Sequence, residues 1–484
     1  MCLFPASPYA AWRRLHGAAF YLNETEDPPP ERLLQAVWFH QRLLRHRLRT
    51  VDGRALRVLH PGFWNRERGP DFRDAVLQWE GEAARTGDVE IDLHPRDWHG
   101  HRHQANPDYQ KVVLHVVWEM GAPTGRPTLV LRHVLDAPLA DLGAWLGTET
   151  AGAFPLELRG HCCRPLQSLD QDGLEELLKQ AAALRLQAKA AHFQARARQA
   201  GWEQALWEGL FRALGYKQNL WPMLHLAELL PQLNPPAARL AVPVLQARLF
   251  GAGGLLPEEL TRRQRASDRY VRELWDAWWR DREAFSNQVL PRQLWRLSGQ
   301  RPANHPHRRL ALAAHWLADE GFLQRMEAWG TGALSPKQVP SALFTALRVP
   351  VDAFWSWHWT LRSPRLAKPR PLLGTTRATD LAVNVILPWL WIRAVEGKND
   401  RLRQELERRY FAWPAGEDNA ILRLARRRLL GQEKVAAAKR AAAQQGLLQI
   451  VRDFCEHADS LCADCHFPEL VRRWPTSGRT LEDL

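Results

Sequence analysis

The spacing of hydrophobic residues changes once along this chain, from a strand pattern to a helical one. Between residues 54 and 134, short runs rich in Val, Leu and Ile are separated by Gly, Pro, Asn or Asp, as strands are separated by turns. From about residue 165 onward, apolar residues recur three or four positions apart, which is typical of helices that bury one face. The sequence therefore predicts a sheet in the N-terminal third and a large helical region after it.

We expect the strand-like part to form a mixed α/β unit, followed by an all-α region. A helix over 31–45 precedes strands at 54–60, 72–79 and 87–94, and a connection leads to further strands at 112–118 and 128–134. Helices are expected from 174–199 to a last one at 418–455. Because 484 residues exceed one ordinary core, we predict three parts: an α/β domain at 1–150, a helical domain at 151–450 and a cysteine-containing tail at 451–484.

The net charge of the chain favours a polyanionic partner. Its 66 Lys and Arg against 53 Asp and Glu give +13, and basic proteins bind nucleic acid through release of phosphate counterions. An arginine-rich but merely solvated surface would give the same balance. No run of 18 uninterrupted apolar residues is present, and the first residues lack a basic leader before an apolar segment. The sequence therefore predicts a cytoplasmic protein without a membrane-spanning helix.

One predicted strand carries three titratable side chains on a single face. In the segment 87–94, alternation places Glu90, Asp92 and His94 opposite the apolar residues. Like charges in a row repel unless a cation or solvent separates them, and carboxylate oxygens suit a hard cation such as Mg²⁺. The alternative is the solvent-facing edge of an antiparallel sheet. A metal site is favoured by Asp71 and by nearby histidines at positions 94, 99, 101, 103 and 115.

The position of Asp71 relative to this strand depends on the register of the hairpin. If 72–79 and 87–94 pair as a plain hairpin, Asp71 lies opposite roughly residue 95. Convergence of Asp71 with Glu90 then requires a bend or a bulge. In the plain register, His94 is expected to lie nearer Asp71 than Glu90 does.

This pattern resembles the PD-(D/E)xK nuclease superfamily. The pair Pro70-Asp71 opens one strand, and Glu90-x-Asp92 stands on the next. The resemblance implies a restriction-endonuclease-like mixed sheet in which Asp71 and Glu90 bind Mg²⁺ or Mn²⁺, and in which the metal activates water to cleave nucleic acid. Asp92 replaces the usual Lys of that superfamily. Asp92 could be an additional metal ligand. Lys111, His94 or Arg96 could take the role of the missing lysine.

Three functions are consistent with this resemblance. The first is a metal-dependent nuclease that hydrolyses phosphodiester bonds. The second is an inactive nuclease-fold protein that binds nucleic acid or serves as a scaffold, and the missing Lys favours it. The third is a different hydrolase that uses the histidines at 94–103 with a transition metal.

A wider resemblance is to the bacterial family called domain of unknown function 2851. It rests on HPGFWNRERGPDF at 60–72, GDVEIDLHPRDWHGHRH at 87–103 and DYQKVVLHVVWE at 108–119, with ALGYKQNLWP at 213–222 and RPANHPHRRL at 301–310. Together with the cysteine-containing tail, these segments extend over nearly the whole chain. The resemblance supports the placement of the site and implies no particular reaction.

A basic stripe is expected on the helix at 174–199. Arg185, Lys189, His192 and Arg196 are about four residues apart and so share one face. Such a face contacts phosphates in some proteins and is simply solvated in others. Arg185, Lys189 and Arg196 are therefore our candidates for binding nucleic acid.

The cysteines near the C-terminus have the spacing of metal ligands. Cys455, Cys462 and Cys465 are separated by six and two residues, which resembles the start of the iron–sulfur motif in helix-hairpin-helix DNA glycosylases. Six cysteines in so long a chain do not form a disulfide framework, and soft thiolates suit Zn²⁺ or an iron–sulfur cluster. A zinc site can also be completed by histidine ligands in place of a fourth cysteine. The alternative is a group of buried thiols at a helix end. A fourth ligand would come from Cys162, Cys163, His457 or His466.

Overall fold

The computed structural model describes residues 7–16, 28–65, 68–122, 124–146, 160–260, 269–431, 440–455, 462 and 465–474. Contacts divide the chain into two compact units, one of residues 1–188 with 418–484 and one of residues 189–417. The first unit contains the sheet and helices from both ends of the chain, and the second is helical. The three-part division expected from the sequence stays a prediction, and its boundary after residue 150 lies outside the described residues.

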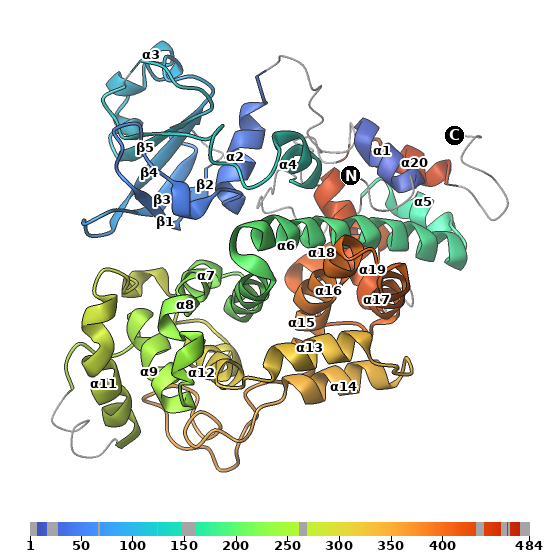
Figure 1. Cartoon of the computed structure of the whole chain (residues 1–484). Coiled ribbons are helices and arrows are strands. Elements are labelled where there is room, and N and C mark those ends of the chain that lie inside the picture. Colours follow the sequence, from blue (N-terminus) through green and yellow to red (C-terminus); the bar gives the residue numbers. More distant parts are fainter. Residues whose placement is uncertain are drawn as a thin grey trace. The chain divides into compact units, whose positions relative to one another are not determined.

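The described residues of the first unit form one six-stranded mixed sheet (Figure 1). The order across it is β1-β3-β4-β5-β6, and β2 pairs with β3. Strands β1, β3 and β4 are antiparallel, whereas β4, β5 and β6 run parallel. The predicted mixed α/β unit is thus confirmed. Its strands are β1 (Leu56–His60), β2 (Phe63–Trp64), β3 (Phe72–Trp79), β4 (Arg85–Asp92), β5 (Val112–Val117) and β6 (Thr128–Val130).

Helices α2 (Glu31–His40) and α4 (Leu139–Trp145) pack on one face of the sheet. This core joins Val37 and Trp38 of α2 to Val89 of β4, and all three side chains are fully buried. Helix α2 ends before the predicted residue 45 because Gln41 adopts a left-handed φ of 50°. Its N–H then caps the carbonyl of Trp38.

A β-bulge interrupts the pairing of β3 with β4. Phe72 pairs with Val89 and Ala75 pairs with Gly87, so that two residues of β3 lie opposite Asp88 alone. A shift of one residue exchanges the two faces of a strand. The bulge therefore decides which side chains at the start of β3 share a face with the acidic residues of β4.

Asp74 holds the bulge in place. It adopts a φ of 56°, and its N–H donates to Asp88 Oδ1 at 3.2 Å. Strand β4 also begins at residue 85, two positions earlier than predicted. As a result, the residue before β3, Asp71, lies beside Glu90 rather than opposite residue 95.

The connection from β4 to β5 lies against the face of the sheet opposite α2. It contains α3 (Asp97–Gly100) and two short 3₁₀ turns, η2 (His103–Ala105) and η3 (Pro107–Tyr109). The ring of Trp98 in α3 lies 5.2 Å from the ring of His115 in β5, measured between centroids. This face is therefore covered and carries polar side chains, whereas the core between the sheet and α2 is apolar.

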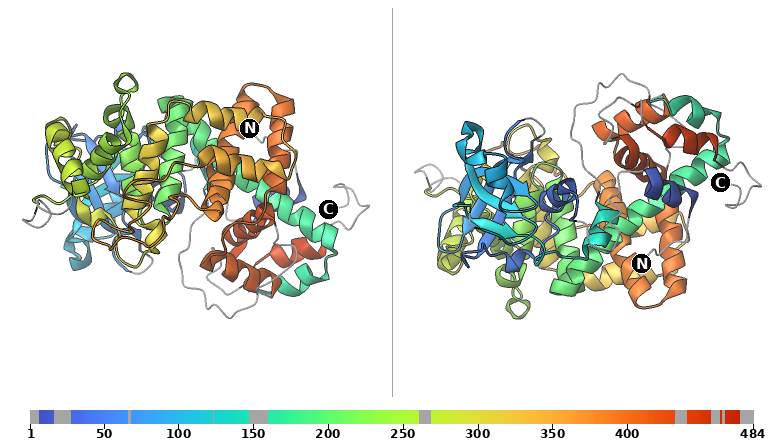
Figure 2. Two further views of the ribbon diagram at one scale, coloured as in Figure 1. Left: turned by 90° about the horizontal axis from the view of Figure 1, so that it is seen from below. Right: turned by 90° about the horizontal axis from the view of Figure 1, so that it is seen from above.

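The remaining helices of the first unit share a second hydrophobic core. It joins Leu177 and Leu178 of α6 to Leu447 and Ile450 of α19, and Figure 2 shows the C-terminal helices in red beside the green start of α6. The helices of this second core are α1 (Pro8–His16), α5 (Cys163–Ser168), the first part of α6 (Gln171–Gly215), α18 (Ala420–Leu430), α19 (Ala441–Ile450) with its π-helical end (Val451–Cys455), and α20 (Phe467–Arg472).

The predicted helix at 418–455 includes residues 432–439, which lie outside the described residues.

The second unit continues α6 and adds further helices. One described segment, Thr375–Glu396, is long and apolar enough to cross a membrane, but 72% of its apolar window is buried inside the structure. This burial is the behaviour of a core helix. The helices after α6 are α7 (Leu220–Glu228), α8 (Leu230–Leu233), α9 (Val242–Ala252), α11 (Arg269–Asp281), α12 (Pro306–Leu317), α13 (Phe322–Thr331), α14 (Gln338–Leu347), α15 (Thr375–Leu381), α16 (Leu387–Glu396) and α17 (Asp400–Ala412).

We predict that Gly62→Ala destabilises the protein more than Gly53→Ala. Both glycines have a positive φ, 96° and 85°, so each alanine costs about 1–2 kcal/mol of backbone strain. A Cβ at position 62 would also lie 2.9 Å from the Arg73 carbonyl oxygen in the bulge, whereas position 53 is open. We expect a further loss of about 1–3 kcal/mol at position 62, measured by denaturant unfolding. Equal losses for the two variants would contradict close packing against the bulge.

Candidate functional site

Asp71 and Glu90 lie side by side at the bulge, and backbone hydrogen bonds hold both carboxylates. The N–H of Asp71 donates to Glu90 Oε2 at 3.0 Å, and the N–H of Ile91 donates to Asp71 Oδ2 at 3.0 Å. Glu90 is only 6% exposed. Contrary to the plain-hairpin expectation, it is Glu90 that contacts Asp71. His94 lies beyond the end of β4, with its Nδ1 3.9 Å from Glu119 Oε2.

Helix α2 adds two residues that the sequence analysis did not single out. Gln35 Nε2 donates to Asp71 Oδ1 at 2.7 Å and to Glu31 Oε1 at 2.9 Å. Glu31 begins α2 and is exposed, so it forms the solvent side of the carboxylate group. Its four-residue spacing from Gln35 puts both on one helix face. That spacing is visible in the sequence, but the meeting of this face with Asp71 is not.

Asp92, at the end of β4, lies between two histidines. Its Oδ2 is 2.9 Å from Nε2 of the fully buried His115 in β5, and its Oδ1 is 3.7 Å from Nδ1 of His101. The side chain of His101 is 59% exposed, whereas Asp92 is 2% exposed. Asp92 thus connects a buried imidazole to one that solvent reaches. The burial of Glu90 and Asp92 excludes the solvent-facing edge considered for this face.

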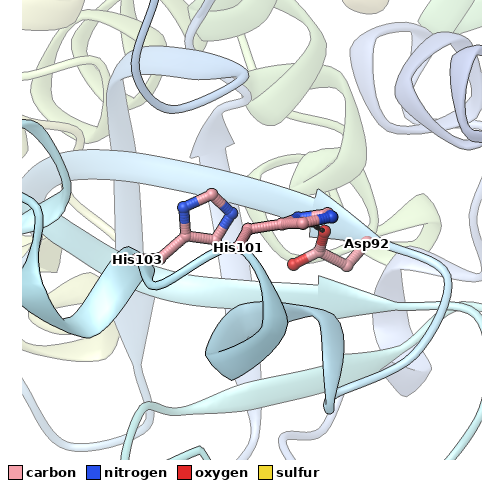
Figure 3. A group of neighbouring side chains, drawn as sticks. All are labelled: Asp92, His101 and His103. Carbon is pink, nitrogen blue, oxygen red and sulfur yellow. Dashed lines mark ion pairs between the residues drawn. The ribbon is translucent and has the colours of Figure 1, made fainter.

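His103 completes a possible ligand set beside the carboxylates. Its ring stacks on Tyr109 with centroids 3.9 Å apart, and its Nε2 lies 3.4 Å from Glu90 Oε1. Neither ring nitrogen has a hydrogen-bond partner among the described residues. Ligand atoms of Asp92, His101 and His103 all lie within 4.8 Å of one another, and Figure 3 shows these three side chains gathered together.

Burial and mutual repulsion weaken the acidity of the carboxyl groups. Loss of solvent, and then the charge of Glu31, raises the pKa of Asp71 to about 7. Loss of solvent, and then the charges of Asp71 and Asp92, raises the pKa of Glu90 well above its usual range. Burial lowers the pKa of His103, which keeps this imidazole neutral at neutral pH. A bound cation favours the ionised carboxylates and the neutral imidazole.

The donor atoms of the cluster belong to two groups of different chemistry. Glu31, Asp71 and Glu90 offer only oxygen atoms, which suits Mg²⁺ or Mn²⁺. Asp92, His101 and His103 offer one carboxylate and two imidazoles, which suits a transition metal such as Zn²⁺ or Fe²⁺. In both cases the cation would offset the repulsion that burial imposes on the carboxylates.

Lys111 is not among the residues brought together here. It is exposed, and its carbonyl accepts the N–H of Asp88 at 2.9 Å. This contact places it at the start of the parallel strands, whereas Glu90 pairs with His115 farther along. Its proposed role in place of a catalytic lysine stays a prediction.

The three cations expected to bind nucleic acid each make a contact within the protein. These contacts are hydrogen bonds of 2.6 to 2.8 Å. They join Arg185 to Gln445, Lys189 to Asn384, and Arg196 to Glu208. Binding of phosphates by these residues stays a prediction.

The cysteines of the predicted C-terminal metal site lie in the helical part of the first unit. Cys162 and Cys455 belong to the same hydrophobic core, and Cys465 packs against it. His457 lies outside the described residues. A metal at these cysteines stays a prediction from their spacing.

Comparison with known proteins shows a family without an assigned activity. A family model described as a protein of unknown function (DUF2851) matches residues 31–419. No curated protein and no solved structure matches the chain. The matched range contains the sheet, all the carboxylates and histidines of the cluster, and Cys162, and it ends before Cys455.

Glu90→Gln is expected to stabilise the metal-free protein at alkaline pH. Because the pKa of Glu90 is raised in the folded state, this carboxyl favours folding while it is protonated, and the contribution is lost as the pH rises toward the folded-state pKa. The amide can still accept the N–H of Asp71 but carries no charge. In EDTA we expect a Tm several degrees above that of the unsubstituted protein at about pH 8, and little difference at about pH 5. Thermal unfolding monitored by circular dichroism measures it.

Glu80→Gln is the matched control for this measurement. Glu80 is an exposed residue just after β3, so neutralising it should not change the pH dependence of Tm. No gain in Tm for Glu90→Gln, or an equal gain for Glu80→Gln, would contradict the raised pKa of Glu90.

Proposed function

The chain belongs to the DUF2851 family of proteins of unknown function, and we propose that it is a metal-dependent nuclease. The observation that carries this proposal is the contact between Asp71 and Glu90 at the bulge, where backbone hydrogen bonds hold the half-buried carboxylate of Asp71 beside the buried carboxylate of Glu90. Two acidic groups this close to each other and partly removed from solvent are costly without a cation. Their placement on adjacent strands supplies the oxygen ligands that a nuclease metal requires.

The order of elements supports a restriction-endonuclease-like core. Helix α2 precedes the antiparallel strands β1, β3 and β4, and a connection then leads to β5, which is parallel to β4. Pro70-Asp71 stands at the start of β3, and Glu90-x-Asp92 ends β4. The PD-(D/E)xK resemblance implies these same positions for its metal ligands.

Asp71 and Glu90 are the residues that would hold Mg²⁺ or Mn²⁺, with Glu31 at the exposed side. When bound, such an ion makes water a better nucleophile and neutralises charge on the phosphate. The hydrogen bonds of Asp71 with Ile91 and Gln35 fix the orientation of its carboxylate. Preorganised ligands of this kind spare the site from reorganising when the substrate binds.

His101 takes the place of the missing lysine in this proposal. Its exposed ring lies beside Asp92, which His115 holds from the other side at 2.9 Å. A carboxylate next to an imidazole orients the ring and stabilises its protonated form. His101 is thus placed to take the proton of the attacking water, and His115 acts as a positioning residue.

Exposed cations near the cluster support a polyanionic substrate. Arg32 follows Glu31, and Arg102 stands between His101 and His103. The side chain of Arg96, just before α3, is 81% exposed. These arginines, with the net charge of +13, favour contact with a phosphate backbone.

A second candidate is a hydrolase with a transition metal. The mutual approach of Asp92, His101 and His103 within 4.8 Å favours it, because two imidazoles and a carboxylate are typical ligands of Zn²⁺ and Fe²⁺. In this case His101 is a metal ligand rather than a proton acceptor. The two candidates therefore predict different effects of changing His101.

Glu90→Gln is expected to lower nuclease activity by on the order of 100-fold or more, because the metal contributes several kcal/mol to stabilising the transition state. Purified protein is incubated with single- and double-stranded DNA and RNA, in Mn²⁺ or in EDTA. Cleavage should require both Mn²⁺ and Glu90. Glu80→Gln, the matched control, should cleave like the unsubstituted protein.

Two outcomes would count against a nuclease. Cleavage that Glu90→Gln leaves unchanged would place the activity elsewhere or in a contaminant. Salt-sensitive binding of nucleic acid with no cleavage of any substrate would instead favour an inactive scaffold, whose affinity should not depend on chelators or on Glu90.

His101→Asn is expected to lower kcat by about 100-fold and to leave KM and Mn²⁺ affinity unchanged, because it removes a proton acceptor and no metal ligand. The control is His99→Asn, which changes an exposed histidine two residues away and should have little effect. Calorimetric titration with Mn²⁺ and Zn²⁺ accompanies the kinetics. Loss of metal binding in His101→Asn would overturn the role of proton acceptor and favour the transition-metal hydrolase.

A further inference from the structure

Four cysteines from distant parts of the sequence gather in the helical core of the first unit. Cys162 directly precedes α5, and Cys455 ends the π-helical turn after α19. Cys462 has a left-handed φ of 77°, and Cys465 lies just before α20. Cys162, Cys455 and Cys462 are buried, and Cys465 is half-buried. The fold thus places Cys162, one of the expected candidates for a fourth ligand, near the three cysteines whose spacing resembles that of a metal site.

The thiols are close enough to influence one another electrostatically. Burial, and then the charges of Cys455, Cys465 and Cys462, raises the pKa of Cys162. Burial is also the main cause that raises the pKa of Cys455, to about 12, with contributions from Cys465 and Cys462. Ligation of a metal would require each thiol to lose its proton.

A buried cation stands beside this group. Arg428 is 2% exposed, and its Nη2 donates to Cys462 Sγ at 3.0 Å. Burial acts to lower the pKa of Arg428, but Cys455 and Cys462 outweigh this effect and raise it. Metal-bound thiolates would place negative charge beside this guanidinium.

The positions of the sulfur atoms favour a cofactor larger than one ion. Four thiolates around Zn²⁺ at about 2.3 Å would lie roughly 3.8 Å apart. Among the described residues, the set of three or more ligand atoms within 4.8 Å of one another is Asp92, His101 and His103, and no cysteines meet this condition. The cysteines are therefore spread more widely than a zinc site requires.

We propose that Cys162, Cys455, Cys462 and Cys465 ligate an iron–sulfur cluster, with Arg428 as its buried counter-cation. Complete cysteine ligation is the usual arrangement for such clusters. The cluster arrives preformed from a carrier protein, and the four cysteines replace the thiolates of the carrier. Each cysteine loses one proton to solvent, the carrier thiolates are released, and no electron is transferred.

The cluster would join the two chain segments that form the first unit. Cys162 lies in the segment that ends at residue 188, and the other three lie in the segment that begins at residue 418. A shared cofactor couples its own binding to the folding of both segments. This role is independent of the nuclease site, so the failure of one proposal would not affect the other.

The test measures iron, acid-labile sulfide and zinc in the full chain, purified without oxygen. We expect visible absorbance typical of iron–sulfur proteins, with iron and sulfide in equal amounts of at least about two per chain. Cys162→Ser should lose most of both. Cys163→Ser is the matched control, because it makes the same change at the neighbouring buried cysteine and should retain the cluster.

The metal and sulfide content of the unsubstituted protein tests the proposal even if Cys162→Ser fails to fold. Stoichiometric zinc without sulfide, or thiols that bind neither metal after reconstitution with iron and sulfide, would overturn the proposal. A cluster retained in full by Cys162→Ser, or lost equally in Cys163→Ser, would remove Cys162 from the ligand set. Bleaching of the cluster by a chelator should also lower the Tm of the unsubstituted chain.

Discussion

The hydrogen bond from the Asp74 N–H to Asp88 secures the bulge on which the candidate site depends. Without the extra residue, the register set by Ala75 and Gly87 would continue, and Asp71 would fall on the apolar face of the sheet. With it, Asp71 lies beside Glu90, whose carboxylate accepts the Asp71 N–H. Bulges commonly reorient a side chain next to an active site. Here the left-handed backbone of Asp74 is a local cost that aligns two carboxylates.

The charged cluster and the apolar core occupy opposite faces of the same strand. Val89 and Ile91 are fully buried against α2, while Glu90 and Asp92 are nearly as buried beneath the β4–β5 connection. Burying acids raises their pKa values and lowers stability at neutral pH. Such an arrangement is typical of functional sites, where stability is given up for reactivity.

The elements were predictable because each strand and helix follows its own hydrophobic period, and β3 was placed at residues 72–79 as observed. The register between β3 and β4 was not predictable. It depends on where the turn between the strands closes and on a bulge that does not change the alternation of polar and apolar residues. Alternation also failed to show that Glu90 is buried, since the covering segment contains Trp98 but no regular pattern. The approach of Gln35 to Asp71, and of Cys162 to the C-terminal cysteines, joins distant segments and therefore lies beyond local sequence patterns.

The first unit is built from two separate segments of the chain, and this affects how it folds during synthesis. Leu177 and Leu178 pack against Leu447 and Ile450, yet the ribosome makes residues 189–417 in between. At about 5–20 residues per second, that insertion occupies on the order of tens of seconds. During this interval Leu177 and Leu178 lack the residues that later cover them. A chain that ended before α18 could not complete this core.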